Sequence, residues 1–309
     1  MATSSWAGRG ARPRVSVVVV TYNSADVIEA CLGSLRAAAS GVELAGVVVV
    51  DNGSRDATVD IVRRCCPTAE VVVQPNLGYA AGLNAGFARC RPDDDVVILN
   101  PDSRPGAGSL RAMSEAVSRG VGLVVPRLYD SDGELAFSLR RAPTLRTALG
   151  EALVGGERAG RWEGWGEIVA NRSAYEQQRP ADWATGAVML ITGACRRVVG
   201  PWDESFLLYG EETDFALRAK VAGLSLVYTP TAVAHHAGGE SNTSPLLWSL
   251  LTTNRVKLYR QRHGPASSAV FWLIVALNEA LRACVGRATA KAALVALLLP
   301  RRRVIALQP

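Results

Sequence analysis

The chain has 309 residues, of which 49% are hydrophobic and 20% are charged. This length allows one large domain with a buried core or two small ones, and the composition excludes an intrinsically disordered chain. The formal net charge of +6 and the pI of about 9.2 fit an anionic partner, such as a nucleotide diphosphate or an anionic lipid head group. They fit equally well an arginine-rich composition without functional meaning.

The N-terminal residues and the cysteines predict a cytoplasmic protein. Residues 1–13 are polar and predict a disordered leader that lacks the apolar segment of a signal peptide. No cysteine belongs to a CxxC pair, so free thiols of a cytosolic enzyme are the simplest account. The six cysteines are Cys31, Cys65, Cys66, Cys90, Cys195 and Cys284.

The first part of the chain alternates short apolar runs with helical periods. Continuous valine runs between helices predict a parallel sheet that is covered on both faces. Each run ends in a polar cluster, and ligands bind beyond the carboxyl ends of such strands, so the clusters predict the edge of a nucleotide site. Ser24 and Ser54 are predicted to cap the first two helices. The expected strands are Val15–Val20, Val47–Val50, Val71–Val73 and Val96–Leu99, and the expected helices cover 27–35, a segment with Val59, Ile61 and Val62, and Tyr79–Cys90.

The second part of the chain is irregular at first and then regular again. Residues 131–180 show little periodicity, which is typical of loops that are functional or mobile. Strands are expected at Ala187–Ile191 and Leu224–Tyr228, the latter ended by Pro230, with a helix over Glu211–Ala222 between them.

From Pro245 onward the sequence is helical in period and basic. Its apolar stretches, Ala269–Leu277 and Ala292–Leu299, are each too short for a clean membrane span of about 20 residues. Two interpretations remain open. The helices pack on the domain, or they lie at a membrane interface with arginines such as Arg301–Arg303 at the head groups.

Three groups of polar residues carry possible chemistry. The carboxylate of Asn100-Pro101-Asp102 follows a strand and can hold a divalent cation on phosphate oxygens, although this tripeptide is also an ordinary turn. His236 lies in a glycine-containing loop and can bind Mn²⁺, although a lone histidine is more often structural. Glu211, Glu212 and Asp214 open a helix, where the dipole favours acids, but their crowding also raises a pKa and suits a general base.

In this order the motifs resemble the family 2 inverting glycosyltransferases of the GT-A fold, and most of all their rhamnosyltransferase-like bacterial branch. The resemblance implies an α/β fold with a Rossmann-like mixed sheet flanked by helices and a helical C-terminal tail. It implies a catalytic domain over 14–244 and a helical extension over 245–309. The matching stretches are VSVVVVTYNSADVIEACLGSL, VVVVDNGSRDATVDIV, NLGYAAGLNAGF, VVILNPDS, DWATGAVMLI, FLLYGEETDFALRAKVAG and VYTPTAVAHHAGGES.

The resemblance also implies roles for single residues. Asp102 and His236 would bind Mg²⁺ or Mn²⁺, and Asn100 stands where the family has its first metal-site Asp. Glu212 would be the catalytic base, but it replaces the family's Asp, so Glu211 and Asp214 stay open as alternatives. The nucleotide would be bound by Thr21, Tyr22, Asn23, Asp51, Asn76, Gly78 and Asn100, and the acceptor side would be Trp183, Thr185 and Gly186.

The implied reaction is direct displacement at an anomeric carbon, with a metal on the leaving diphosphate and one carboxylate as base. The expected donor is dTDP-rhamnose or a UDP-sugar, and the expected acceptor is a lipid-linked or cell-envelope glycan. Contact with the inner face of the plasma membrane is expected, and a nucleic-acid partner is not. A dinucleotide-dependent oxidoreductase would need GxGxxG where this chain has TYNSAD. A catalytically silent nucleotide-sugar-binding protein is the other alternative, and the joint retention of Asp102, Glu212 and His236 argues against it.

Overall fold

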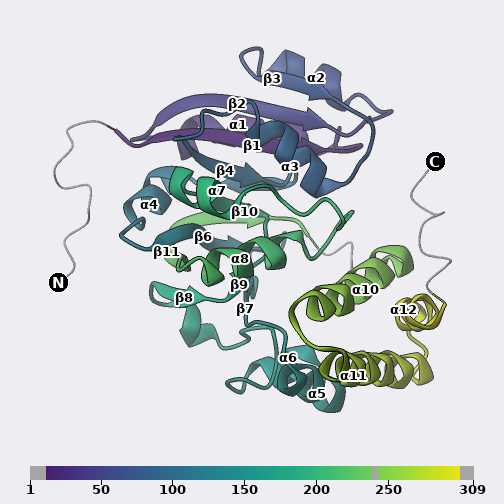
Figure 1. Cartoon of the computed structure of the whole chain (residues 1–309). Coiled ribbons are helices and arrows are strands. Elements are labelled where there is room, and N and C mark those ends of the chain that lie inside the picture. Colours follow the sequence, from purple (N-terminus) through teal and green to yellow (C-terminus); the bar gives the residue numbers. More distant parts are fainter. Residues whose placement is uncertain (1–11, 239–242, 300–309) are drawn as a thin grey trace. The chain divides into compact units, whose positions relative to one another are not determined.

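The computed structural model describes residues 12–238 and 243–299 (Figure 1). The leader predicted over 1–13 therefore lies almost wholly outside the described residues, as do Arg301–Arg303 of the tail. The described residues form two compact units. The first comprises 12–140, 172–207 and 211–238, and the second comprises 141–171, 208–210 and 243–299. The domain boundary at residue 244 stays a prediction.

The first unit is built on a mixed β-sheet. Its strands are β1 (Arg14–Thr21), β2 (Glu43–Asp51), β3 (Glu70–Val73), β4 (Asp95–Leu99), β5 (Ser103–Pro105), β6 (Val121–Tyr129), β8 (Arg179–Ala181), β10 (Val188–Ile191) and β11 (Ser225–His236). They lie in the order β3-β2-β1-β4-β10-β6-β11-β5, with β8 paired to β11. The first four strands are parallel as predicted, whereas β10 is antiparallel to both β4 and β6. β7 (Leu139–Arg140) and β9 (Trp183–Ala184) pair separately.

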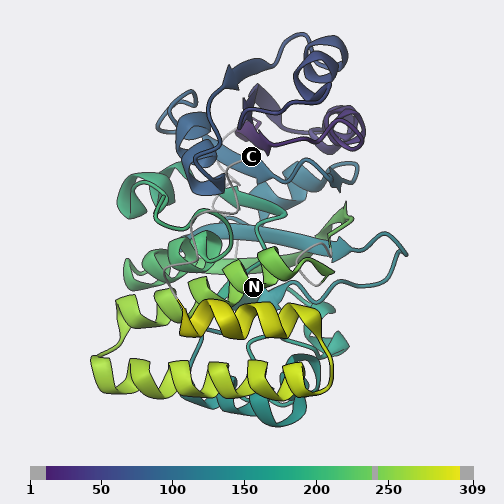
Figure 2. The same ribbon diagram turned by 90° about the vertical axis from the view of Figure 1, so that its right-hand side faces the viewer.

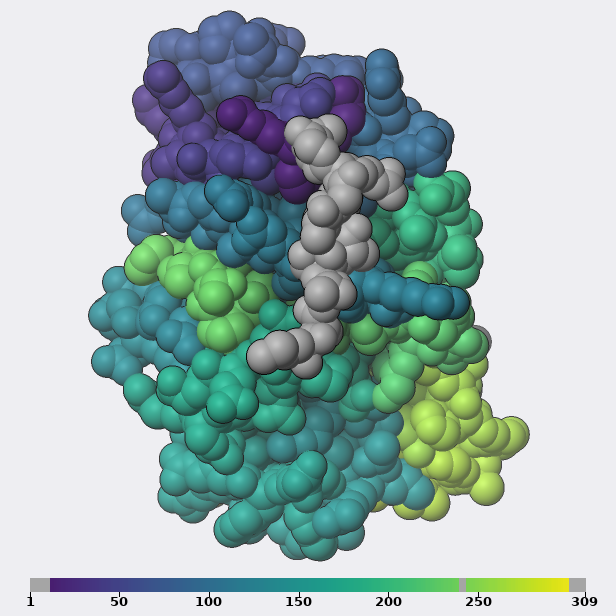
Figure 3. Space-filling model, turned by 90° about the vertical axis from the view of Figure 1, so that its left-hand side faces the viewer, coloured from purple at the N-terminus to yellow at the C-terminus, as the bar shows by residue number. Residues whose placement is uncertain are grey.

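The helices of this unit cover both faces of the sheet. They are α1 (Ile28–Ala38), α2 (Thr58–Cys65), α3 (Tyr79–Phe87), α4 (Ser109–Glu115), α7 (Gly193–Val199) and α8 (Glu211–Val221), with a short 3₁₀ turn over Arg172–Tyr175. Buried residues of α1, α2 and α4 form one core with alternate residues of β1 such as Val17 and Val19. Helix α3, the predicted small-residue helix, packs closely on the other face of the sheet. The approach requires glycine, since a Cβ on Gly86 would lie 2.4 Å from Val18 Cγ1. Figure 3 shows one face of the molecule, with the surface of the N-terminal part of this unit in purple to blue.

One strand is longer than expected. β11 does not end at Pro230 but continues to His236, with a register shift against β6 between Thr229 and Val233. The shift accommodates Pro230, which has no N–H to donate to the ladder. The extension places His236 opposite Ser103 of β5.

Both predicted helix caps were wrong. Helix α1 begins at Ile28, and Ser24 contributes its backbone carbonyl to the preceding turn while its hydroxyl bonds to Tyr22. Helix α2 begins at Thr58, and the hydroxyl of Ser54 instead donates to Asp51. Both serines therefore serve the polar loops at the strand ends.

The second unit is helical. It contains α5 (Leu145–Val154), α6 (Gly156–Gly160), α10 (Pro245–Arg262), α11 (Pro265–Cys284) and α12 (Ala288–Leu298), so residues 131–180 are more ordered than their weak periodicity predicted. Figure 2 shows α10, α11 and α12 running alongside one another, and α5 also packs on α11. In its core the Tyr259 ring stacks on His263 at 3.8 Å and on Phe271 at 3.9 Å between ring centroids.

Helix α11 is longer than the apolar stretch that predicted it. It extends Ala269–Leu277 at both ends to 20 residues, so the expectation that this stretch is too short to span a bilayer was wrong as to length. Among the helices that the structure describes, α11 alone is long and apolar enough to cross a membrane, judged by length and composition.

Candidate functional site

The polar clusters at the carboxyl ends of β1 and β2 are joined into one loop system. Asp51 is 1% exposed and accepts hydrogen bonds from Thr21 Oγ1 at 2.8 Å, Ser54 N at 2.8 Å and Ser54 Oγ at 2.5 Å. Asn23 has a left-handed backbone, with φ of 48°, and its N–H donates to Ser54 Oγ. A carboxylate offers about four acceptor sites, so these three hydrogen bonds use most of the acceptor capacity of Asp51. The exposed residue Tyr22 directly precedes Asn23 in the sequence.

Gly78 is held where a close backbone approach requires glycine. Its φ is +100°, and a Cβ there would lie 2.5 Å from the carbonyl oxygen of Leu207. Its N–H donates to Asn76 Oδ1, and its carbonyl accepts from Asn52 Nδ2 at 3.1 Å. Asn52 was not among the predicted site residues. It could have been included because it lies between Asp51 and Gly53, in a polar cluster at the end of a predicted strand.

The predicted metal-site residues come together at the ends of β4 and β11. Asp102 Oδ1 lies 3.3 Å from His236 Nε2, and Asn100 Nδ2 lies 3.3 Å from the same nitrogen. Gly238 N donates to Asp102 Oδ2 at 3.1 Å. Burial opposes ionisation of Asp102, but the contacts with His236 and Gly238 outweigh it and hold the pKa of Asp102 below its ordinary value.

This set fits a cation that takes most of its ligands from substrate and water. Within 12–238 and 243–299 no three His, Cys, Asp or Glu side chains are grouped to hold a metal. Mg²⁺ is commonly bound by one or two carboxylates together with substrate phosphates, and imidazole suits Mn²⁺. One carboxylate and one imidazole facing each other are compatible with either ion.

The three candidate acids at the start of α8 differ sharply in their surroundings. Asp214 accepts from Arg218 Nε at 2.7 Å, so its carboxylate is already paired within α8. Glu211 is 1% exposed. Burial raises the pKa of Glu212, while the backbone N–H groups of Glu212 and Gly186 oppose that rise. On balance, the surroundings of Glu212 therefore raise its pKa.

Tyr79 links the acids to the metal-site residues and was missed by the sequence interpretation. Its hydroxyl donates to Asn100 Oδ1 at 3.1 Å. Its pKa is raised well above the ordinary value by burial and by the negative charges of Glu212, Glu211 and Asp102. The hydroxyl of this buried tyrosine thus lies beside Asn100, one of the predicted site residues.

Of the predicted acceptor residues, Gly186 lies beside Glu212. A Cβ on Gly186 would come within 2.6 Å of Glu212 Cγ. Thr185 N donates to the Ser138 carbonyl, and Trp183 in β9 has the Arg140 guanidinium 5.8 Å from its ring centroid.

The sequence profile described as "Glycosyl transferase family 2" matches residues 16–170 of the chain. The chain belongs to glycosyl transferase family 2. The N-acetylglucosaminyl-diphospho-decaprenol L-rhamnosyltransferase of Mycobacterium tuberculosis is 30% identical to this transferase, over 74% of this chain and 78% of that protein. Rhamnosyltransferase WbbL of Escherichia coli K12 is 24% identical, over 83% of this chain and 99% of its own.

The structural comparison agrees on the fold. The mannosyltransferase PcManGT from Pyrobaculum calidifontis, in complex with GDP-Man and Mn²⁺, superposes with a TM-score of 0.56 at 21% identity. The match covers 95% of this chain and 83% of that one. The transferase therefore has the predicted GT-A fold, and it is a glycosyltransferase that uses a nucleotide-sugar donor. Membership of the family excludes the oxidoreductase alternative and argues against a silent binding protein.

We expect Gly186→Ala to slow transfer while donor binding survives. The new methyl group would displace the Glu212 side chain, and a misplacement of about 1 Å can lower a rate by about 10²-fold. Steady-state kinetics with the donor held at saturation would measure the change in kcat. Gly46→Ala is the matched control, because nothing lies within 4 Å of a Cβ there. Equal kcat values in Gly186→Ala and Gly46→Ala would show that the contact between Gly186 and Glu212 does not affect transfer.

Proposed function

We propose that this transferase moves L-rhamnose, with inversion, from dTDP-rhamnose to a hydroxyl group of a lipid-linked glycan, with UDP-sugars as the next donors to test. The observation that carries the mechanism is the contact chain at the strand ends. The Tyr79 hydroxyl donates to Asn100 Oδ1, and His236 Nε2 lies 3.3 Å from Asn100 Nδ2 and 3.3 Å from Asp102 Oδ1. The names of the Mycobacterium tuberculosis and Escherichia coli relatives support rhamnose, and the former also supports a lipid diphosphate acceptor.

On the donor side, Asp102 and His236 would hold Mg²⁺ or Mn²⁺, which would neutralise charge on the leaving diphosphate. Asn100 accepts from Tyr79 and points its amide at His236, so it would orient the imidazole ring. The loops of Tyr22–Asn23 and Asp51–Ser54 are tied together and would cup the base and ribose.

On the acceptor side, Glu212 would accept the proton of the attacking hydroxyl group. The raised pKa brings this carboxyl closer to neutrality, where a general base works best. Trp183, Thr185 and Gly186 would position the acceptor beside it. Direct attack with a single base produces inversion, whereas retention by double displacement would require a nucleophile on the opposite sugar face.

The donor assignment can be tested by incubating the protein with dTDP-rhamnose, UDP-sugars and GDP-sugars and measuring released nucleotide. We expect the fastest release from dTDP-rhamnose, and only with Mg²⁺ or Mn²⁺ present. Faster release from a UDP-sugar would replace rhamnose in the proposal. Release that is unchanged by a chelator would contradict the metal assignment.

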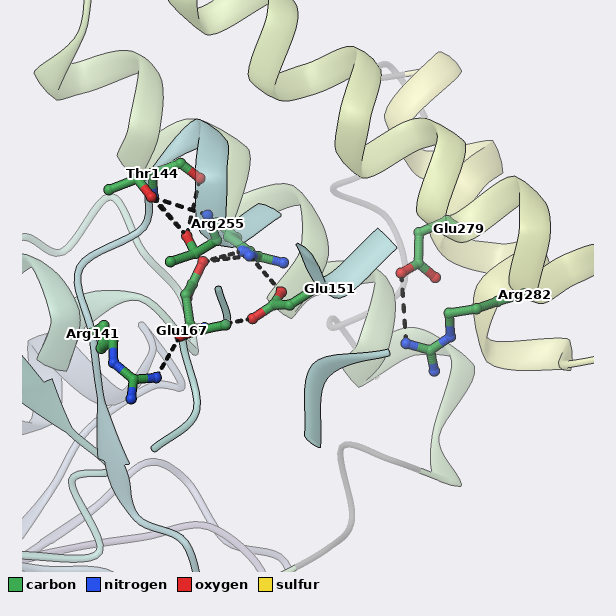
Figure 4. Close-up of polar contacts among 9 residues, drawn as sticks. Arg141, Thr144, Glu151, Glu167, Arg255, Glu279 and Arg282 are labelled. Carbon is green, nitrogen blue, oxygen red and sulfur yellow. Dashed lines mark hydrogen bonds and ion pairs between the residues drawn. The ribbon is translucent and has the colours of Figure 1, made fainter. Parts of the chain in front are cut away.

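The tail has a surface that fits a membrane interface. On α11 a row of apolar side chains is exposed at helical spacing. The only acid in the sequence of 245–309, Glu279, is buried and accepts from Trp248 Nε1 at 2.9 Å. Its carboxylate lies 3.8 Å from Arg282 Nη1 (Figure 4). Arg287 and Lys291 are exposed just beyond it. We propose that this row rests in the anionic lipid surface that carries the acceptor. The row consists of Val270, Leu273, Leu277 and Leu281 of α11, followed by Val285 directly after the helix.

We expect the full chain to float with anionic liposomes at low salt and less at high salt, since each nearby basic residue adds about 1 kcal/mol to binding. Leu273→Glu with Leu277→Glu should abolish flotation. Val198→Glu, which alters an exposed valine on α7, is the control and should leave it intact. Flotation that the double variant retains would show that the row does not bind lipid. Extraction from cells by detergent alone would indicate a spanning helix instead.

A further inference from the structure

The segment Leu208–Gly210, which leads directly into α8, has an unusual backbone. Tyr209 has a φ of 68° and Gly210 a φ of 104°. A non-glycine residue in the left-handed region is costly and persists only where its surroundings hold it. The next two residues along the chain are Glu211 and Glu212. Whatever fixes this segment therefore fixes the point at which α8 begins.

Asn254 of α10 holds this segment. Its side-chain amide donates one hydrogen bond to the Leu208 carbonyl and one to the Tyr209 carbonyl, both at 2.9 Å. Asn254 is 8% exposed, so water competes poorly for these bonds. A single NH₂ group thus joins two successive carbonyls, and no aliphatic residue can replace it.

The neighbouring residue anchors the helix that carries Asn254. Arg255 lies between Glu151 of α5 and Glu167, with Nη2 2.7 Å from Glu151 Oε2 and Nε 2.7 Å from Glu167 Oε1 (Figure 4). Glu167 N in turn donates to Glu151 Oε1 at 2.8 Å. Paired and nearly buried charges of this kind fix geometry, because breaking one partner leaves another uncompensated. Asn254 therefore projects from a helix, α10, that these ion pairs tie to α5 and to Glu167.

We propose that Asn254 is a positioning residue for sugar transfer, because it fixes the chain segment from which the proposed base Glu212 extends. The inference rests on the proposed function, and it concerns the acceptor-side step alone. Donor-binding loops at the ends of β1 and β2 have their own hydrogen bonds and should not depend on Asn254.

Asn254→Ala should therefore lower kcat for transfer by about 10²-fold, the scale of a 1 Å misplacement, and leave donor KM unchanged. Asn254→Asp should be worse than Asn254→Ala, because it places a carboxylate against two carbonyl oxygens. Thr252→Val is the matched control. It is equally buried on α10, but its hydroxyl donates to the helix's own Trp248 carbonyl, and kcat should stay at the wild-type value.

The decisive measurement is the double variant with Glu212→Gln, assayed by transfer kinetics and by titration with the nucleotide diphosphate. If Asn254 acts through Glu212, adding Asn254→Ala to Glu212→Gln should cost almost nothing further. Additive losses, a parallel rise in donor KM, or wild-type kcat in Asn254→Ala would overturn the inference. Asn254→Ser replaces Asn254→Ala if that variant does not fold, with the same expectations. If Glu212→Gln itself transfers sugar normally, the proposed base is wrong, which is a separate failure.

Discussion

Glu212→Gln is expected to bind the nucleotide sugar normally and to lose transfer by about 10²–10⁴-fold, the usual contribution of a general base. The amide has the shape of the carboxylate but cannot accept the proton of the acceptor hydroxyl group. Gly186 N–H can still donate to the amide oxygen, so the local structure should survive. Titration with the nucleotide sugar and steady-state kinetics separate binding from transfer.

The raised pKa of Glu212 implies that transfer depends on pH in a definite direction. Glu212 must be deprotonated to act, and burial raises its pKa above the ordinary glutamate value. Transfer should therefore fall as the pH drops through that raised pKa, at a higher pH than an exposed carboxyl would produce. Glu211→Gln is the matched variant. If Glu211→Gln were inactive and Glu212→Gln active, the base would be Glu211.

Asp102→Ala is expected to abolish metal-dependent turnover while the fold survives. Asp102 is one of the two proposed protein ligands, and without it the charge on the leaving diphosphate is uncompensated, which costs several kcal/mol. The side chain is partly exposed and lies at the end of the strand rather than in the core, so stability should change little. Nucleotide release at saturating Mn²⁺ and a thermal melt are the two measurements.

Asp60→Ala controls for the loss of a negative charge, because Asp60 is an exposed acid on α2. It should keep full turnover. His236→Ala should reduce turnover in the same direction as Asp102→Ala, since the two side chains face each other at 3.3 Å. Near-normal rates of Asp102→Ala at saturating Mn²⁺ would refute the assignment.

Much of the first unit could be predicted because its strands are continuous apolar runs. The runs around Val17, Val48 and Val97 became neighbouring parallel strands, and the small residues of Tyr79–Cys90 do pack on β1. The antiparallel insertion of β10 could not be read from periodicity, because a short buried strand has the same pattern in either direction. The extension of β11 was missed because Pro230 normally ends a strand, and only the register shift shows how it is accommodated.

The candidate site was predicted in parts, and the contacts between the parts came from the fold. Strand-end position indicated Asp102, but its nearness to His236 depends on the pairing of β11 with β5. The resemblance favoured Glu212 among the three acids of α8 and left Glu211 and Asp214 open. The partner of Asp214, Arg218, now separates Asp214 from Glu212. Tyr79 lies in a matching stretch but was not singled out, and Asn254 lies in none. The contacts that distinguish them are with residues distant in the chain. The catalytic, metal and acceptor roles of all these residues stay predictions.

The most direct test of the account is the anomeric configuration of the product. The full-length protein would be incubated with dTDP-rhamnose, Mn²⁺ and a polyprenyl-diphosphate-linked N-acetylglucosamine, and the new glycosidic bond would be examined by NMR. The account predicts a rhamnosyl product whose anomeric configuration is opposite to that of the donor. A product with the donor's own configuration would contradict it, because retention requires a second displacement that a single base at Glu212 cannot supply.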